Sequence, residues 1–78
     1  MESPSKSSTL DVRDIIAKGE EPFAAIRSSV DALGPGDSLE IIAPFMPAPL
    51  IELLKSEGFE ANMEHRPDGA WSVRFQRP

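Results

Sequence analysis

The sequence lacks cysteine altogether and contains only one histidine. Without a thiolate the chain forms no disulfide, thiolate metal site, persulfide or cysteine nucleophile. Transition-metal sites usually take about three or four protein ligands, so a single imidazole predicts no bound metal and no cofactor. The chain also lacks any apolar run near the ~20 residues that cross a bilayer, and its first residues lack the apolar core of a signal peptide. We therefore expect a cytoplasmic protein without thiol or metal chemistry.

Positive charge is scarce as well. Eight Lys and Arg residues stand against 13 Asp and Glu residues in a chain of 78, which gives a net charge of −5. Nucleic acids and anionic membranes bind clustered Lys and Arg, so neither is an expected partner. The length allows one small domain. Residues 1–8 combine serine, proline and charge without periodicity, which predicts a disordered tail before a single domain over 9–78.

The domain is predicted to begin with a strand. In the segment 9–13, apolar Leu10 and Val12 alternate with charged residues, which is typical of a strand buried on one side. Residues 14–21 carry glycine and carboxylates, so they are predicted to form mostly a loop with two isoleucines at its base.

A helix should follow, opened by Pro22, because the first helical position does not need the N–H that proline lacks. Gly34 is predicted to end it in the left-handed conformation. The segment 38–42 then alternates as a second strand, and a strand–helix–strand order of this length predicts that the two strands run parallel. The apolar stripe of the helix is spaced for burial and consists of Phe23, Ile26, Val30 and Leu33.

The segment 43–49 is dense in proline, so it is predicted to be neither helix nor central strand. A second helix should open at Pro49, with Pro47 as the alternative. Gly58 is predicted to end that helix, with Phe59 packed against its last turn. The predicted buried stripe of this helix is Leu50, Leu53 and Leu54.

The remainder has the pattern of a hairpin. Two alternating segments, 59–66 and 71–76, flank the turn-forming sequence Pro67-Asp68-Gly69. The order is therefore β-α-β-α-β-β. Each helix has a single apolar stripe, so both should cover the same face. The predicted fold is an α/β two-layer sandwich, with a four-stranded mixed sheet and both helices on one face.

The stretch from Gly19 to Ile41 resembles the TusA-like, or SirA-like, family of small sulfur carriers, whose fold has the same element order. In that family a Cys-Pro-x-Pro motif opens the first helix, and Pro22 lies at its second proline. The sequence Pro35-Gly36-Asp37-Ser38-Leu39 matches the family's Pro-Gly-Glu/Asp-Ser/Thr-Leu turn, without insertion between the two motifs. The resemblance extends over Leu10–Ile42; beyond it, only pattern and length agree.

The chain departs from this family at the reactive position. Gly19 stands where the family's sulfur-carrying cysteine would be, so persulfide transfer is excluded. The resemblance implies a cysteine-free branch of bacterial domains of unknown function, some joined to hemerythrin-like domains. Many of those relatives carry an Asp-His-Asp-Pro-type segment after the second strand. Here the segment is Ala43-Pro44-Phe45-Met46-Pro47, which offers no polar site.

The polar candidates do not predict an enzyme. His65 has no partner within reach on its own strand, so it is interpreted as a half-exposed histidine near the hairpin tip. Glu20 and Glu21 precede the first predicted helix, where they stabilise its positive end; catalysis would require a pocket that separates their pKa values. No serine has a histidine–acid arrangement.

A loop is the first candidate binding surface. Prolines hold an aromatic ring and a methionine beyond the carboxyl end of the second strand, where open α/β sheets often bind ligands. A preorganised loop loses less entropy on docking. The alternative is that the aromatic ring folds under the second helix as part of the core. The candidate residues are Pro44, Phe45, Met46 and Pro47.

The sheet face opposite the helices is the second candidate surface. Its mixed charge is typical of a solvated face. It would otherwise be a polar docking platform or a dimer contact centred on Ile42. Alternation assigns to it Asp11, Arg13, Ser38, Glu40, Ile42, Asn62, Glu64, Ser72, Arg74 and Gln76.

These observations predict a small non-enzymatic accessory or binding domain, monomeric or weakly dimeric, whose partner is another protein. The alternative is a small-ligand or metal-responsive domain linked to redox or nitrogen-oxide metabolism. That alternative follows only from the hemerythrin-linked relatives, and therefore from analogy.

Overall fold

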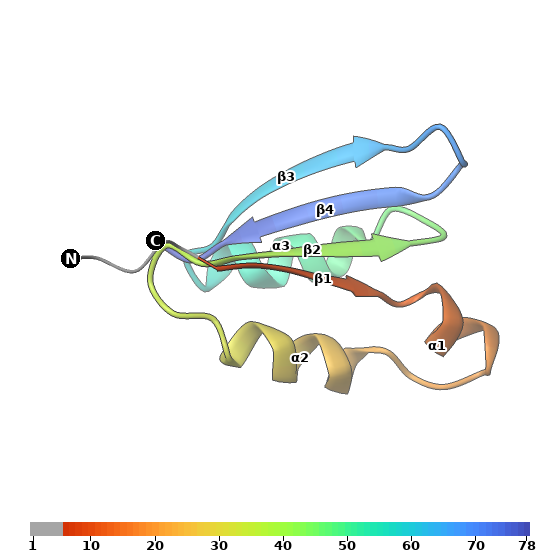
Figure 1. The fold of residues 1–78 in the computed structure, drawn as a ribbon, viewed down its shortest axis with the longest axis horizontal. Helices are drawn as coiled ribbons and strands as arrows, with labels where there is room; N and C mark the ends of the chain where they lie inside the picture. The colour runs from red at the N-terminus through yellow and green to blue at the C-terminus, as the bar shows by residue number, and fades with distance from the viewer. Residues whose placement is uncertain (1–5) are drawn as a thin grey trace.

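A computed structural model describes residues 6–78, while residues 1–5 lie outside the described part. Figure 1 shows a four-stranded sheet with α2 and α3 packed against it and a short α1 after the first strand. The predicted two-layer architecture is confirmed, with one helix more than expected. The elements are β1 Ser7–Asp11, α1 Arg13–Ala17, α2 Phe23–Asp31, β2 Ser38–Ala43, α3 Ala48–Ser56, β3 Glu60–His65 and β4 Trp71–Gln76.

The sheet is mixed, as predicted. Its strand order is β1-β2-β4-β3, with β1 parallel to β2 and the remaining neighbours antiparallel. One row across the sheet joins Leu10, Ile41, Val73 and Met63. Because side chains alternate along each strand, this register places the row on one face and its neighbours on the other.

A single core lies between that face and the helices. The sheet contributes Leu39 and Phe75, which have 1% and 0% exposure. Both main helices join the same cluster, so the prediction that they cover one face is confirmed. Burying a large apolar side chain contributes about 1.5–3 kcal/mol, and this cluster therefore dominates the stability of the domain. From the helices it takes Ile26 and Val30 of α2 and Ile51 and Leu54 of α3.

The start of the chain differs from the prediction. β1 begins at Ser7, two residues before the predicted start, because the backbone of Ser7 and Ser8 pairs with β2 although their side chains give no apolar signal. The strand ends at Asp11 rather than Arg13, although the Val12 N–H still donates to the Ile42 carbonyl (3.0 Å).

The segment predicted to be mostly loop contains α1, so that prediction is wrong. The helix has only five residues, which is too short to show an apolar period in the sequence. The Ile16 N–H donates to the Val12 carbonyl (3.0 Å), and the side chains of Ile15 and Ile16 pack partly buried against the core. The two isoleucines therefore anchor a helical turn.

The predicted left-handed stop at Gly34 is also wrong. α2 ends at Asp31, and the positive φ belongs to Gly36, at +82°. Asp37 N–H donates to the Gly34 carbonyl (3.0 Å), which places Pro35 and Gly36 at the centre of a tight turn. Such a turn takes proline at its second position and glycine at its third, so the positive φ falls on Gly36 in this turn and α2 ends without a left-handed glycine.

The second main helix begins at Ala48, with Pro49 as its second residue. Its buried side chains are Ile51 and Leu54, whereas the predicted core residue Leu53 is exposed. Its predicted end is confirmed. The Phe59 N–H donates to the Leu54 carbonyl (3.0 Å), and both side chains are buried.

The predicted hairpin is confirmed. Within its turn, the Gly69 N–H donates to the Arg66 carbonyl (3.0 Å) and the Arg66 N–H to the Ala70 carbonyl (2.8 Å). Met63 and His65 lie on the helix-covered side but remain exposed, because β3 is an edge strand. None of the helices in residues 6–78 has the length and apolar character needed to cross a bilayer.

Asp37 ties the beginning of the chain to the turn before β2. Its two carboxylate oxygens accept the N–H of Lys6 (2.8 Å) and of Gly34 (2.9 Å). These two hydrogen bonds hold the pKa of Asp37 below its ordinary value, and the bond from Lys6 has the larger effect.

Replacing Asp37 with asparagine should therefore lower Tm at neutral pH, since both amides lose a charged acceptor and one of them faces an NH2 group that cannot accept. A carboxyl whose folded pKa is lowered stabilises the fold above its unfolded pKa of about 4 and loses that contribution as pH falls through the folded value. Thermal unfolding followed by circular dichroism at about pH 7 and about pH 3 should thus show a difference from wild type that shrinks in acid. Glu60→Gln, an exposed change on β3, is the control, and an Asp37→Asn difference that is equal at both pH values would contradict this account.

Candidate functional site

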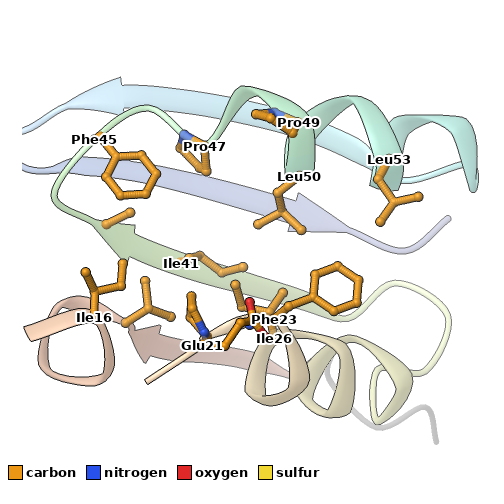
Figure 2. A pocket seen from close by; sticks show the side chains of 13 residues that line it. Ile16, Glu21, Phe23, Ile26, Ile41, Phe45, Pro47, Pro49, Leu50 and Leu53 are labelled. Atoms are coloured by element: carbon orange, nitrogen blue, oxygen red, sulfur yellow. The ribbon is translucent and has the colours of Figure 1, made fainter. Parts of the chain in front are cut away.

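An apolar cleft lies between α2 and α3 on the helix side of the sheet. Its volume is about 320 Å³. Figure 2 shows Ile41 of β2 at its floor, with α3 on one side and α2 on the other. The lining consists of Val12, Ile16, Glu21, Pro22, Phe23, Ile26, Ile41, Ala43, Phe45, Pro47, Pro49, Leu50 and Leu53.

The walls of the cleft are set by the places where the two helices begin. Phe23 is the first residue of α2, and Pro49 is the second residue of α3. Each helix therefore presents its first turn to the cleft, including Leu50 of α3, and α3 adds Leu53 from the next turn. Phe23 and Leu53 are 44% and 38% exposed, so the cleft is open to solvent at its rim.

The predicted binding loop forms one end of the cleft. Phe45 is 55% exposed and lines it, so this ring is not the core lid that was the alternative prediction. Pro47 is buried and also lines the cleft, while Pro44 and Met46 are exposed beside it. Two of the four candidate residues thus contribute directly to the hollow.

Glu21 is the one charged residue among those that line the cleft. One of its carboxylate oxygens accepts the N–H of Phe23 (2.7 Å), so the side chain satisfies a free donor at the start of α2. Glu20 is exposed and does not line the cleft, so the two glutamates do not converge on a shared pocket.

An ion pair joins the two helices. The guanidinium of Arg27 on α2 lies 2.8 Å from the carboxylate of Glu57, at the end of α3, and 3.1 Å from that of Asp31. The hydrogen bond from Arg27 holds the pKa of Glu57 below its ordinary value. This contact links the two helices, and the guanidinium charge is already paired with two carboxylates.

Gly19, the position of the family's cysteine, is explained by local structure. It follows α1 with φ of +76°, and its N–H donates to the Ile16 carbonyl (2.9 Å) while the Glu20 N–H donates to that of Ile15 (3.1 Å). This pair of bonds is the Schellman stop of a helix, which favours glycine. Gly19 does not line the cleft.

His65 stacks on Trp71, with 4.7 Å between ring centroids and 24° between planes. The contact is a cross-strand pair between β3 and β4. Among residues 6–78 no group of three or more His, Cys, Asp or Glu side chains is placed to hold a metal ion.

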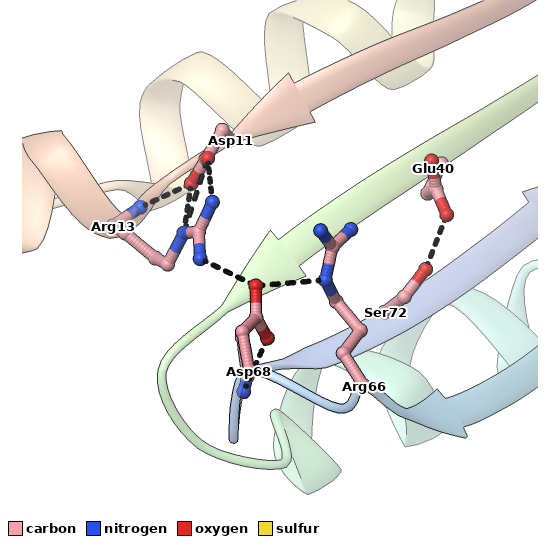
Figure 3. A network of polar contacts seen from close by, with 7 residues as sticks. Asp11, Arg13, Glu40, Arg66, Asp68 and Ser72 are labelled. Carbon is pink, nitrogen blue, oxygen red and sulfur yellow. Dashed lines mark hydrogen bonds and ion pairs between the residues drawn. The ribbon is translucent and has the colours of Figure 1, made fainter.

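The opposite sheet face carries a polar network. Figure 3 shows Arg13 between Asp11 (2.6 Å) and Asp68 (3.3 Å), with Arg66 also on Asp68 (3.3 Å). The hydrogen bond from Arg13 lowers the pKa of Asp11. The pKa of Asp68 is lowered as well, mainly by the hydrogen bond from the N–H of Ala70. The network ties the end of β1 to the hairpin turn.

The same face is less solvated than predicted. Ile42 is buried at 7% exposure, so the predicted centre of a dimer contact is not accessible. Ser72 is buried too and donates to the carboxylate of Glu40. Arg13 lies in α1 rather than on this strand face, although it contacts the face through Asp68. The polar groups here mainly bind one another.

Sequence reasoning missed Phe23, Leu53 and Glu21 as lining residues because it assigned the first two to the core. A signal was present on α3. Its apolar residues Leu50, Ile51, Leu53 and Leu54 span roughly 160° of the helix, more than the ~100° stripe that contact with one sheet requires. The excess apolar surface faces the cleft.

Replacing Gly19 with cysteine should lower the free energy of unfolding by about 1 kcal/mol, because a side chain strains the left-handed backbone there. No atom lies within 4 Å of the added Cβ, so the cost comes from the backbone alone. Gly19→Asn should cost less, since asparagine tolerates this conformation. Urea unfolding of both variants measures the difference; equal losses would contradict the assignment of Gly19 as a helix stop.

Comparison with known proteins places the chain in a family. Residues 9–77 match the family described as "Uncharacterized conserved protein (DUF2249)". The chain shows no significant similarity to any curated protein or to any solved structure. The match begins within β1 and ends at Arg77, and so it includes every element that builds the cleft. The chain belongs to the DUF2249 family.

Proposed function

We propose that this protein is a non-enzymatic, cytoplasmic binding domain whose cleft between α2 and α3 receives an apolar segment of a partner protein. One observation carries the proposal. Of the five large apolar side chains exposed in residues 6–78, three line the cleft and a fourth, Met46, belongs to the loop at its end. The three are Phe23, Phe45 and Leu53.

Clustering of this kind supports binding, because scattered apolar residues are ordinary on a protein surface whereas grouped ones mark interaction sites. A groove between helix starts offers pockets for the spaced apolar anchors of a peptide segment. The remaining exposed residue of this class, Met63, lies apart on the edge strand β3.

The loop at the end of the cleft supports the same proposal. Pro44, Pro47 and Pro49 restrict the backbone around Phe45 and Met46, so less conformational entropy is lost when a partner docks. Phenylalanine and methionine both supply adaptable apolar contact.

We also propose that the scaffold is that of the TusA-like carriers without the sulfur-carrying thiol. The element order and the turn through Pro35, Gly36 and Asp37 support this relationship. Gly19 accounts for the missing cysteine as a helix stop, so the position has a structural role of its own.

A small apolar ligand in the same cleft is the second candidate. The volume of about 320 Å³ falls at the lower end of ordinary ligand sites, and the lining is predominantly apolar, as in such sites. Native mass spectrometry after mild purification would reveal a retained ligand as added mass.

The Phe45→Glu/Met46→Glu double variant and the Leu53→Glu variant should each lose a protein that wild type captures from an extract of the source organism. Charge in the cleft or its loop opposes burial of an apolar segment. Mass spectrometry of the captured proteins is the measurement. These exposed positions should change Tm little, which thermal melts of the same samples check.

Met63→Glu is the matched control, because Met63 is exposed to a similar degree as Met46 but lies away from the cleft. It should capture the same partner as wild type. If the folded cleft variants keep that partner, or if Met63→Glu loses it as well, the cleft is not the binding surface.

A further inference from the structure

We propose that the segment received by the cleft is cationic. Its apolar anchors are accompanied by a lysine or arginine that forms an ion pair with the carboxylate of Glu21. This inference rests on the proposed function and specifies the chemistry of the partner. It is argued from the one charged residue in the lining of the cleft and from the pairing of the cation on α2.

At the α2 end, Glu21 brings a carboxylate to an otherwise apolar lining. Only one of its oxygens is engaged, by the N–H of Phe23 (2.7 Å), and no donor within residues 6–78 is bonded to the other. Figure 2 shows Glu21 near Phe23 and Ile26, where an apolar segment would pass. A cation carried by that segment would complete the hydrogen bonding of the carboxylate.

The guanidinium of Arg27, which belongs to α2, is not available to an acidic partner. Arg27 is held between the carboxylates of Glu57 (2.8 Å) and Asp31 (3.1 Å), so its charge is more than balanced. The chain as a whole carries −5. A carboxylate on the incoming segment would therefore meet repulsion at Glu21 and would find no cation among the residues that line the cleft.

Apolar contact supplies most of the affinity in this arrangement, and Glu21 supplies selection and orientation. Opposite charges at the edge of an interface contribute modestly to affinity but discriminate against like charges. The segment is thus expected to lie with its basic residue toward the start of α2 and its apolar anchors along Phe23, Leu50 and Leu53.

Three blocked model peptides of about 12 residues test the inference, each with leucines at the helical spacing i, i+3, i+4 and i+7. The remaining positions are lysine in the first peptide, glutamine in the second and glutamate in the third. Titration of the ¹⁵N-labelled protein, followed by amide chemical shifts, gives Kd and the location of binding. The lysine peptide should bind about three-fold or more tighter than the glutamine peptide, with shifts centred on the cleft.

Two protein variants separate the local charge from the net charge. Glu21→Gln should remove most of the preference for the lysine peptide over the glutamine peptide, because the lysine loses the carboxylate that selects it. Glu52→Gln, which removes an exposed carboxylate of α3 outside the cleft lining, should leave the preference in place. Equal effects of the two variants would overturn the assignment to Glu21.

Failure of this inference is distinguishable from failure of the proposed function. If the three peptides bind the cleft equally well and Leu53→Glu abolishes their binding, the cationic preference is wrong and the apolar site stands. If none of them shifts the cleft residues, or if Leu53→Glu changes nothing, both the inference and the site are overturned.

Discussion

The burial of one sheet face under two short helices is the interaction on which the rest of this structure depends. α2 contacts β2, while α3 contacts β3, and their buried residues meet in one cluster over the sheet. Because the helices pack on the sheet from either side of β2, their first turns are left with a gap between them. The same packing that stabilises the domain thus creates the cleft, whose floor is the buried Ile41.

The two faces of the sheet differ in chemistry. The helix side is apolar and carries the cleft, whereas the open side carries charges bound to one another across β1 and the hairpin turn. Exposed ion pairs of this kind contribute little to stability, so the apolar packing on the helix side carries most of the stability of the sheet.

Much of the fold was predictable because its signals are local. The hairpin, the parallel crossover and the helix stop before Phe59 each follow from alternation, spacing or turn residues. α1 was not predictable, since five residues show no period. The stop at Gly34 was predicted wrongly because the turn through Pro35 competes with it and moves the positive φ to Gly36.

The candidate site was predictable only in part, because it is formed by residues distant in sequence. The loop that contains Phe45 and Pro47 can be recognised in the sequence because it is rich in proline. Phe23 and Leu53 occupy positions that helical periodicity assigns to the core. What exposes them is the distance between two helices, and periodicity within one helix carries no information on that distance.

The edge strand β3 has a consequence for how copies of this chain meet. Its outer side offers unpaired backbone groups, to which a second β3 is a natural complement. Two copies of β3 can pair antiparallel with their open faces on the same side and Asn62 opposite Asn62. In this register Glu60 of one copy lies opposite Glu64 of the other. Like charges directly opposite each other destabilise a strand pair. Glu60 and Glu64 belong to neither the core nor the cleft. Their repulsion in this register disfavours edge-to-edge association of copies through β3.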